Sequence, residues 1–408
     1  MSEEDAVDRR QFLVTGAAAV AGAALARPAI AKGKKYDPGA SDTEIRLGQT
    51  IPYSGAGSVY GAVGRAQAAY FEELNAKGGV NGRKIRFISL DDAYSAPKCV
   101  EATRRLVEQD EVLAFFGSLG TAPQVAVQKY LNGKGIPQLL LNTGAPRFND
   151  PKQYPWTTPG LPLYSIEATI LANFVAKELP GARVAVLSQN DEYGRDYLNY
   201  FKKALGDRGA VVAEATYDLT DATVDSQMLK LSQSGADVFY NCSSGKFTTQ
   251  SIKKVHELNW KPKLNIIIST SAGSSIINPA GEEATRGLYC AQYVKNISEK
   301  RWQDDPAVKE WEAIRAKHLP NIDPDNNIAF LGYSVGVLMA GILEKCGDEL
   351  TRENVLKHAT NLAGQTAPAL LPGITYGITP TDYSPFNAMI MGRYDGKSWE
   401  LMGDPISR

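Results

Sequence analysis

The chain has 408 residues, of which 43% are apolar and 22% are charged, and its formal net charge is −1. This composition is typical of a soluble globular protein, and the scattered lysines and arginines give no electrostatic basis for a nucleic-acid partner. The three histidines, His256, His318 and His358, each stand in a charged helical context, which argues against a histidine-based metal site or catalytic triad.

Residues 1–31 have the features of an export signal. Arg9-Arg10 precedes an uncharged, Ala-rich run at 12–26, and Ala29-Ile30-Ala31 is a small-x-small cleavage site. The run is shorter than the ~20 apolar residues of a membrane-spanning helix. The pattern resembles a twin-arginine signal, although Asp8 stands where Ser or Thr is commoner. We therefore expect a periplasmic protein cleaved near Ala31, with no later segment able to cross a membrane.

The segment 42–92 predicts a strand, a loop, a helix and a second strand. The first strand, 45–51, runs into a loop rich in Pro, Ser and Gly, and the helix ends at Gly78-Gly79. The second strand, 84–90, is closed by Asp91-Asp92. The loop lies at the carboxyl end of a strand and the start of a helix, where open α/β sheets bind ligands. This unit predicts a protein that holds a small ligand.

Strands and helices continue to alternate as far as residue 293. The predicted strands are 111–116, 136–141, 183–188, 211–216, 238–241, 264–269 and 287–293. The predicted helices are 97–109, 121–132, 166–179, 193–208, 225–234 and 249–258. Each strand is a nearly continuous apolar run, as in a sheet covered on both faces. The alternation predicts two parallel-sheet domains, and the prolines between 155 and 162 indicate a crossover between them.

The last third of the chain has a different pattern. It predicts helices at 305–319, 327–345 and 351–362, the last capped by Thr351. Strands are predicted at 375–378, 387–394 and 398–402. The last two are joined by Asp395-Gly396-Lys397 and are expected to form a β-hairpin.

The sequence gives no motif of an enzyme in the setting that its chemistry needs. It contains no H-E-x-x-H, G-x-x-x-x-G-K-[ST] or G-x-G-x-x-G motif. Gly332-Tyr333-Ser334-Val335-Gly336 matches G-x-S-x-G, but it lies inside the predicted helix 327–345 and not on a turn between a strand and a helix. Cys99, Cys242, Cys290 and Cys346 are widely spaced, which excludes the common zinc patterns. A bridge between Cys242 and Cys290 is conceivable in an exported protein, and buried free thiols are the alternative. We predict no enzyme activity, no cofactor and no metal.

Seven stretches, in order along the chain, resemble the type I periplasmic solute-binding proteins of the branched-chain amino-acid (Leu/Ile/Val-binding) ABC transporter family. They are IRLGQTIPYSGAGSVYG, ELNAKGGVNGRKI, AFFGSLGTAPQVAV, KGIPQLLLNTGAP, VAVLSQNDEYGRDYL, GADVFYNC and AMIMGRYDGKSWEL. The resemblance implies an α/β protein with two Rossmann-like lobes, whose parallel sheets are joined by three crossovers. It places lobe 1 at 42–160 plus 292–372, and lobe 2 at 161–291 plus 373–408.

The resemblance also implies a function. The lobes would close about a hinge on a small ligand, without turnover, and the closed form would dock on an ABC permease and its ATPase subunits. A sensory protein that feeds a membrane receptor is the alternative, and an exported α/β enzyme is a third. A monomer is the simplest expectation.

Two loops are expected to hold a ligand carboxylate. The loop 117–122 precedes a helix, and free N–H groups at a helix N-terminus favour anions. The resemblance therefore implies that the N–H of Ala122 and the hydroxyl of Thr121 bind the carboxylate. The matching residues of a second loop, after the next strand, are Asn142, Thr143 and Gly144. A simple helix cap is the alternative for each loop.

The remaining candidate residues come from three further loops. The resemblance implies that Tyr193 lines the far side of the cleft and that Tyr60 is a bulky aromatic on the first loop. Ser243, next to Ser244, follows the strand 238–241 and could equally be a turn residue.

The informative departure is Ser271. The amino-acid binders of the family place a Glu here to pair with the ligand's ammonium, and a buried ammonium without such a partner is costly. Either Asp191 or Glu192 supplies the charge, or the ligand has no amine. The ligand is then an amino acid, an aromatic or aliphatic carboxylate, or a small amide.

Overall fold

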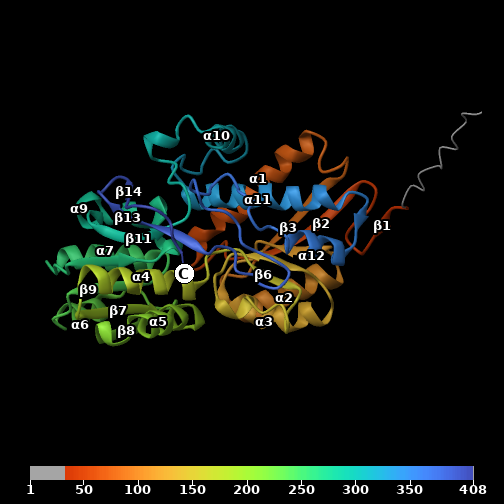
Figure 1. Cartoon of the computed structure of the whole chain (residues 1–408). Helices are drawn as coiled ribbons and strands as arrows, with labels where there is room; N and C mark the ends of the chain where they lie inside the picture. The colour runs from red at the N-terminus through yellow and green to blue at the C-terminus, as the bar shows by residue number, and fades with distance from the viewer. Residues whose placement is uncertain (1–32, 408) are drawn as a thin grey trace, which may run out of the picture. The chain divides into compact units, whose positions relative to one another are not determined.

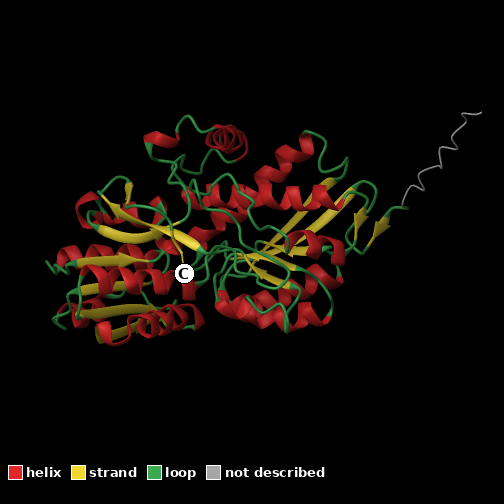
Figure 2. Cartoon of the chain, in the orientation of Figure 1, coloured by secondary structure: helices red, strands yellow, loops and turns green. Residues whose placement is uncertain are grey.

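The computed structural model describes residues 33–407. The predicted export signal, 1–31, lies outside the described residues. Figures 1 and 2 show two groups of strands, each flanked by helices. We name them lobe 1 and lobe 2 after the two large sheets that they contain.

Lobe 1 is built on a five-stranded parallel sheet within the described residues, in the order β3-β2-β4-β5-β6. Its strands are β2 (Glu44–Ile51), β3 (Lys84–Asp91), β4 (Ala114–Phe116), β5 (Gln138–Leu141) and β6 (Thr157–Pro159). The helices between them are α1 (Gly61–Ala76), α2 (Ala96–Glu108) and α3 (Thr121–Gly133). Both β4 and β5 are wholly buried. Their apolar runs had predicted this, because a sheet covered on both faces buries its central strands.

Lobe 2 carries an eight-stranded sheet within residues 33–407, in the order β14-β13-β11-β10-β9-β7-β8, with β15 paired to β13. Its parallel strands are β7 (Ala182–Gln189), β8 (Gly209–Tyr217), β9 (Val238–Cys242), β10 (Leu264–Ile267) and β11 (Leu288–Gln292). Its antiparallel strands are β13 (Ala388–Tyr394), β14 (Trp399–Leu401) and β15 (Ile406–Ser407). The helices are α4 (Tyr164–Glu178), α5 (Glu192–Leu205), α6 (Asp225–Ser232), α7 (Lys246–Glu257), α8 (Ser274–Ile277) and α9 (Glu282–Thr285).

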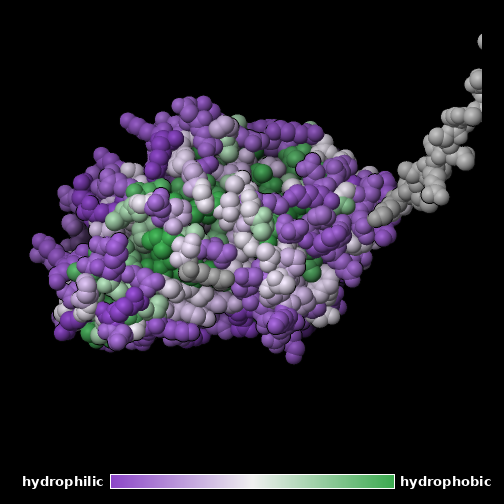
Figure 3. All heavy atoms as spheres, viewed as in Figure 1, coloured by the Kyte–Doolittle hydropathy of each residue, from purple (hydrophilic) through white to green (hydrophobic). Residues whose placement is uncertain are grey.

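The chain passes from lobe 1 to lobe 2 after β6, returns after β11 to form α11, which packs on α1, and enters lobe 2 again before β13, which gives three crossovers. The fold predicted from sequence, two Rossmann-like lobes joined by three crossovers, is confirmed. On the face in Figure 3, hydrophilic residues cover most of the periphery and apolar residues gather toward the middle.

The segment between β11 and β13 adds α10 (Pro306–His318), α11 (Asn327–Cys346) and α12 (Arg352–Ala359). Asp305 caps α10 through the N–H groups of Ala307 and Val308, and Thr351 caps α12 as predicted. The expectation that no later segment could cross a membrane is wrong for α11, which is long and apolar enough. Most of α11 is buried, which is the pattern of a core helix.

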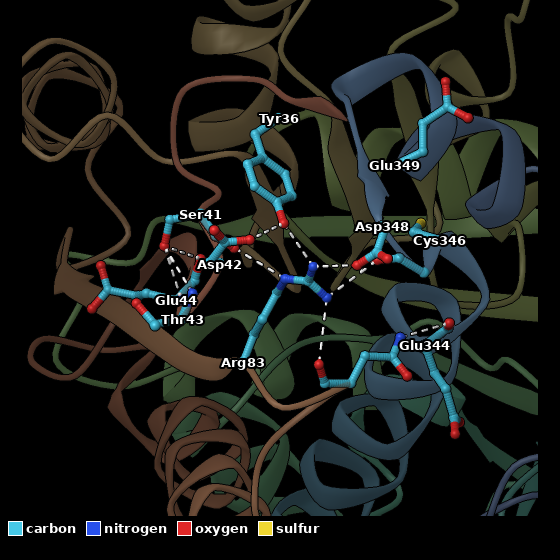
Figure 4. A network of polar contacts seen from close by, with 12 residues as sticks. Tyr36, Ser41, Asp42, Thr43, Glu44, Arg83, Glu344, Cys346, Asp348 and Glu349 are labelled. Carbon is cyan, nitrogen blue, oxygen red and sulfur yellow. Dashed lines mark hydrogen bonds and ion pairs between the residues drawn. The ribbon is translucent and has the colours of Figure 1, made fainter. Parts of the chain in front are cut away.

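A cluster around Arg83 fastens the start of the described chain. There β1 (Lys35–Tyr36) pairs with β12 (Glu349–Leu350). The guanidinium of Arg83, 3% exposed, donates to the hydroxyl of Tyr36 at 2.7 Å, to the carbonyl of Ser41 at 3.0 Å and to Asp348 at 2.5 Å. Figure 4 shows this side chain reaching between the three groups. One buried arginine thus ties the first strand to the end of α11.

Two sequence predictions change in the structure. The predicted strand 375–378 is not a strand, because the N–H of Tyr376 donates to Gln365 and the N–H of Gly377 donates to Pro385, both in loops. All four cysteines are free and buried, so the bridge considered between Cys242 and Cys290 is not formed. The C-terminal hairpin is confirmed as β13 and β14.

Candidate functional site

A cavity lies between the carboxyl ends of the two sheets. Its volume is about 100 Å³. On the same measure one water needs only about 10–15 Å³, so a small organic ligand fits. Lobe 1 lines it with Gly57, Tyr60, Val63, Tyr94, Leu119, Gly120, Thr121 and Asn142. Lobe 2, the crossovers and the segment between β11 and β13 contribute Leu161, Tyr164, Gln189, Tyr193, Ser244, Ser269, Thr270, Gln292, Tyr293, Lys295, Asn296, Asn327 and Trp399, among others.

The start of α3 forms the lobe 1 end of this wall. Its N-cap is Gly120, with φ of 103°, which has no side chain to cap the first turn. A Cβ at Gly120 would lie 2.7 Å from Cε2 of Tyr94, so only glycine lets this ring approach. Free N–H groups at a helix start carry partial positive charge, and this end of the cavity therefore suits an anion.

A chain of hydroxyls continues from α3 into lobe 2. Oγ1 of Thr121 lies 2.8 Å from Oγ1 of Thr143, which lies 3.1 Å from the hydroxyl of Tyr164. Burial raises the pKa of Tyr164 to about 12. These hydroxyls stay protonated at neutral pH and can donate as well as accept.

Tyrosine rings form the lobe 2 wall. Tyr193 meets Tyr164 edge to face at 5.3 Å between ring centroids, and Tyr197 stacks on Tyr164 at 4.5 Å. The hydroxyl of Tyr193 lies 2.8 Å from Oγ1 of Thr270. Offset and edge-to-face contacts of this kind hold rings in fixed orientations, so the wall presents a rigid, flat surface to a ligand.

The buried carboxyl of Glu167 supports this wall from behind. It accepts hydrogen bonds from the backbone N–H of Ser269 at 2.5 Å, from the Ser269 hydroxyl at 2.7 Å and from Tyr197 at 2.7 Å. Burial raises its pKa from 4.5 to about 7, against the lowering effect of these bonds. Glu167 thereby joins α4, α5 and the loop that follows β10.

Tyr60, on the cavity wall, connects the two lobes. Its hydroxyl accepts from the N–H of Gly245 at 3.1 Å and donates to the carbonyl of Thr270 at 3.3 Å. Burial raises the pKa of Tyr60. Both partners belong to lobe 2, so the described arrangement is a closed one.

Charge is nearly absent from the wall. Among the described residues that line the cavity, Lys295 is the one charged side chain, and its ammonium pairs with Asp305 at 2.7 Å and with the carbonyl of Pro368 at 2.9 Å. The two acids considered as ammonium partners, Asp191 and Glu192, do not line the cavity. Asp191 accepts from Gln189 and caps α5, and Glu192 pairs with Arg147.

The structure brings four of the nine predicted site residues onto the cavity wall: Tyr60, Thr121, Asn142 and Tyr193. The other five, Ala122, Thr143, Gly144, Ser243 and Ser271, do not line it. Thr143 lies directly behind Thr121, and Gly144 packs against the carbonyl of Pro162.

The two serines predicted in lobe 2, Ser243 and Ser271, bond to nearby residues and do not line the cavity. The hydroxyl of Ser271 donates to the carbonyl of Ser243 at 2.7 Å, and that of Ser243 donates to Asn241. Their chain neighbours, Ser244 and Thr270, line the cavity instead.

Sequence reasoning missed further wall residues. Tyr94, Gln189 and Gln292 stand at or just beyond the carboxyl ends of predicted strands, and that position was the available signal. Tyr164 opens α4 and Trp399 lies in the C-terminal hairpin, and neither position carried such a signal. Within residues 33–407, no cluster of His, Cys, Asp and Glu suits a metal ion.

Comparison with known proteins supports the same fold. An amino acid binding protein of Pseudomonas aeruginosa is 27% identical over 210 residues, which are 48% of this chain and 53% of that protein. The aligned part thus spans about half the length of this relative.

Two solved structures share the fold at low identity. A branched chain amino acid ABC transporter structure from Thermus thermophilus with bound valine has a TM-score of 0.80 and 17% identity, covering 90% of this chain and 98% of that one. An ABC transporter solute binding protein from R. palustris in complex with benzoate has a TM-score of 0.71 and 17% identity, covering 89% and 97%.

The resemblance seen in the sequence motifs is thereby confirmed at the level of the family. Residues 44–398 match the family described as periplasmic binding protein, and with this match over most of its length the chain belongs to that family.

Proposed function

We propose that this protein is the substrate-binding component of an ABC importer, and that it captures a small carboxylate or amide that carries no ammonium group. The observation that carries the proposal is the cavity wall, which is drawn from both lobes and, among the described residues, contains no acidic side chain. The ligand-binding residues proposed from the sequence that fit this role are Tyr60, Thr121, Asn142 and Tyr193.

The absence of an acidic wall residue weighs against an amino acid. An ammonium buried without a carboxylate partner loses its hydration and gains no ion pair in return. A carboxylate at the start of α3 is stabilised instead, because the N–H groups at a helix N-terminus favour anions. The similar proteins bind both kinds of ligand, since one holds valine and another benzoate.

Closure about the crossovers is the proposed mechanism. The lobes, 42–160 plus 292–372 and 161–291 plus 373–408, would move as two bodies in a hinge transition. The ligand contacts the start of α3 first, and closure then brings Tyr60 to Gly245 and Thr270, where its hydrogen bonds form. The closed monomer would then dock on a permease with its ATPase subunits.

We also propose that residues 1–31 direct export by the twin-arginine route. Mass spectrometry of the exported protein should give a chain that begins at Lys32. A full-length chain in the periplasm, or a chain exported normally after Arg9-Arg10 is changed to Lys-Lys, would contradict this route.

A thermal-shift screen in matched pairs tests the ligand class. Each amino acid is compared with its des-amino acid and with the matching amide. A ligand at 100 times its dissociation constant stabilises the native state by about 2.7 kcal/mol, so a binder raises the melting temperature measurably. We expect shifts with acids or amides, and ligand recovered unchanged. Shifts confined to amino acids would refute the ligand class, and chemical conversion would refute binding without turnover.

A further inference from the structure

Two buried side chains on the part of the wall formed by β11 and β14 lack partners. Gln292, 5% exposed, and Trp399, 3% exposed, both line the cavity. Within the described chain, neither Nε2 of Gln292 nor the indole Nε1 of Trp399 has a hydrogen-bond partner. A buried donor left unpaired costs about 1–3 kcal/mol, so a group that pairs with both would be favoured here.

The neighbouring polar groups of the wall are already paired with one another. Oε1 of Gln189 accepts from Ser244 at 2.6 Å and from Tyr217 at 3.1 Å. Thr270 pairs with Tyr193 at 2.8 Å. Unlike these groups, the donors Nε2 of Gln292 and Nε1 of Trp399 have no hydrogen-bond partner among the described residues.

The sheet holds the two side chains next to each other. Gln292 ends β11, and Trp399 opens β14, on either side of Gly392 in β13. A Cβ on Gly392 would lie 3.1 Å from Cγ of Gln292 and 3.3 Å from Cε3 of Trp399, so both side chains pack over this glycine. The backbone N–H of Trp399 donates to Glu299 at 3.0 Å, and its ring packs on Tyr394 at 5.0 Å.

The chemistry of the indole decides what this pair can bind. A carboxamide can present either its oxygen or its nitrogen, but an indole N–H only donates. The matching ligand atom must therefore be an acceptor, such as a carbonyl, carboxylate or ether oxygen. A ligand ammonium or a purely alkyl end would leave the indole unpaired.

We propose that Gln292 and Trp399 form a second ligand-anchoring point, which selects ligands that carry an oxygen acceptor in addition to the carboxylate or amide group. This inference rests on the proposed function, because it assumes that the cavity is the ligand site. It narrows the substrate class to oxygen-bearing acids and amides, such as oxo acids or dicarboxylates.

Isothermal titration with two isosteric pairs tests the proposal. The pairs are 4-acetylbenzoate with 4-isopropylbenzoate, and 5-oxohexanoate with 5-methylhexanoate, which differ in whether the far end has a carbonyl. Two gained hydrogen bonds predict about tenfold tighter binding of the oxo member of at least one pair. In Trp399→Phe and Gln292→Met, which keep the shape of the wall, we expect this ratio to fall toward one.

Trp311→Phe is the matched control, because Trp311 is also buried and its indole Nε1 also lacks a partner among the described residues, but it does not line the cavity. This variant should keep the wild-type ratio. Nuclear magnetic resonance gives a second readout. The indole ¹⁵N–H resonance of Trp399 is assigned as the one that is missing in Trp399→Phe. It should shift when the oxo acid is added and stay in place when its alkyl isostere is added.

Equal binding of both members in the wild type would overturn the anchoring point and leave the proposed function intact. A ratio that survives in both variants, or failure of both oxo acids to bind, would also overturn it. Binding of amino acids alone would instead overturn the proposed function.

Discussion

At the scale of single residues, Glu167 is the group whose protonation matters most. Its folded pKa of about 7 lies above the ordinary 4.5. Below pH 4.5 the carboxyl is protonated in both states, and between pH 4.5 and 7 the unfolded chain releases the proton that the folded chain keeps. The stability of the folded state therefore falls as pH rises through this window, by about 3 kcal/mol in all.

We predict that Glu167→Gln removes this dependence. The amide oxygen can accept from the N–H of Ser269, and the hydroxyls of Ser269 and Tyr197 can turn to accept from the amide nitrogen. The free energy of unfolding of each protein is measured by urea titration. We expect the value of the wild type minus the value of the variant to decrease between pH 4 and pH 8. Parallel profiles for the two proteins would show that Glu167 has an ordinary pKa.

At the level of residues, position in the sequence located part of the cavity wall, and ligand binding by these residues stays a prediction. Asn142 directly follows β5, Thr121 opens α3 after the short loop that follows β4, and both line the cavity. For Ser243 and Ser271, the chain neighbours Ser244 and Thr270 line the cavity instead, because the two predicted hydroxyls bond to Asn241 and to the carbonyl of Ser243. Trp399 could not be found, because its approach to Gln292 depends on strand pairing across a long separation.

At the scale of elements, the contact of α1 with α11 depends on Gly332. A Cβ there would lie 2.5 Å from the carbonyl oxygen and 2.8 Å from Cα of Val63. Backbone atoms cannot turn aside, so the helices would have to separate. We predict that Gly332→Ala lowers the free energy of unfolding by about 1–3 kcal/mol, measured by urea titration.

Gly341 in the same helix is the control. A Cβ at Gly341 would meet nothing within 4 Å, and Ala is a better helix former than Gly by about 0.5–1 kcal/mol. Gly341→Ala should therefore stabilise the protein. Equal effects of the two substitutions would mean that helix propensity, and not the close approach, governs this contact.

Elements were predictable where apolar patterning was strong. The buried strands and the apolar helix α11 were found within a few residues of their observed ends. The segment 375–378 resembled a strand in composition, but it lies between prolines and its N–H groups bond to loops. Local pattern could not reveal that, because the partners are supplied by tertiary structure.

At the scale of the whole molecule, the alternation of strands and helices sufficed to predict two sheets. The ordered motifs supplied the three crossovers, which composition alone does not give. What the sequence could not show is that the lobes meet through Tyr60 and enclose a wall that, among the described residues, lacks acidic side chains. That wall is the basis of the proposed ligand class.

The most direct test is isothermal titration of the wild-type protein with leucine and with 4-methylpentanoate, which is leucine without its amine. The missing ammonium partner predicts one-to-one binding of 4-methylpentanoate that is at least tenfold tighter than that of leucine. Tighter binding of leucine would mean that a charge outside the wall reaches the ligand, and the account of a cavity for acids without an ammonium group would be wrong.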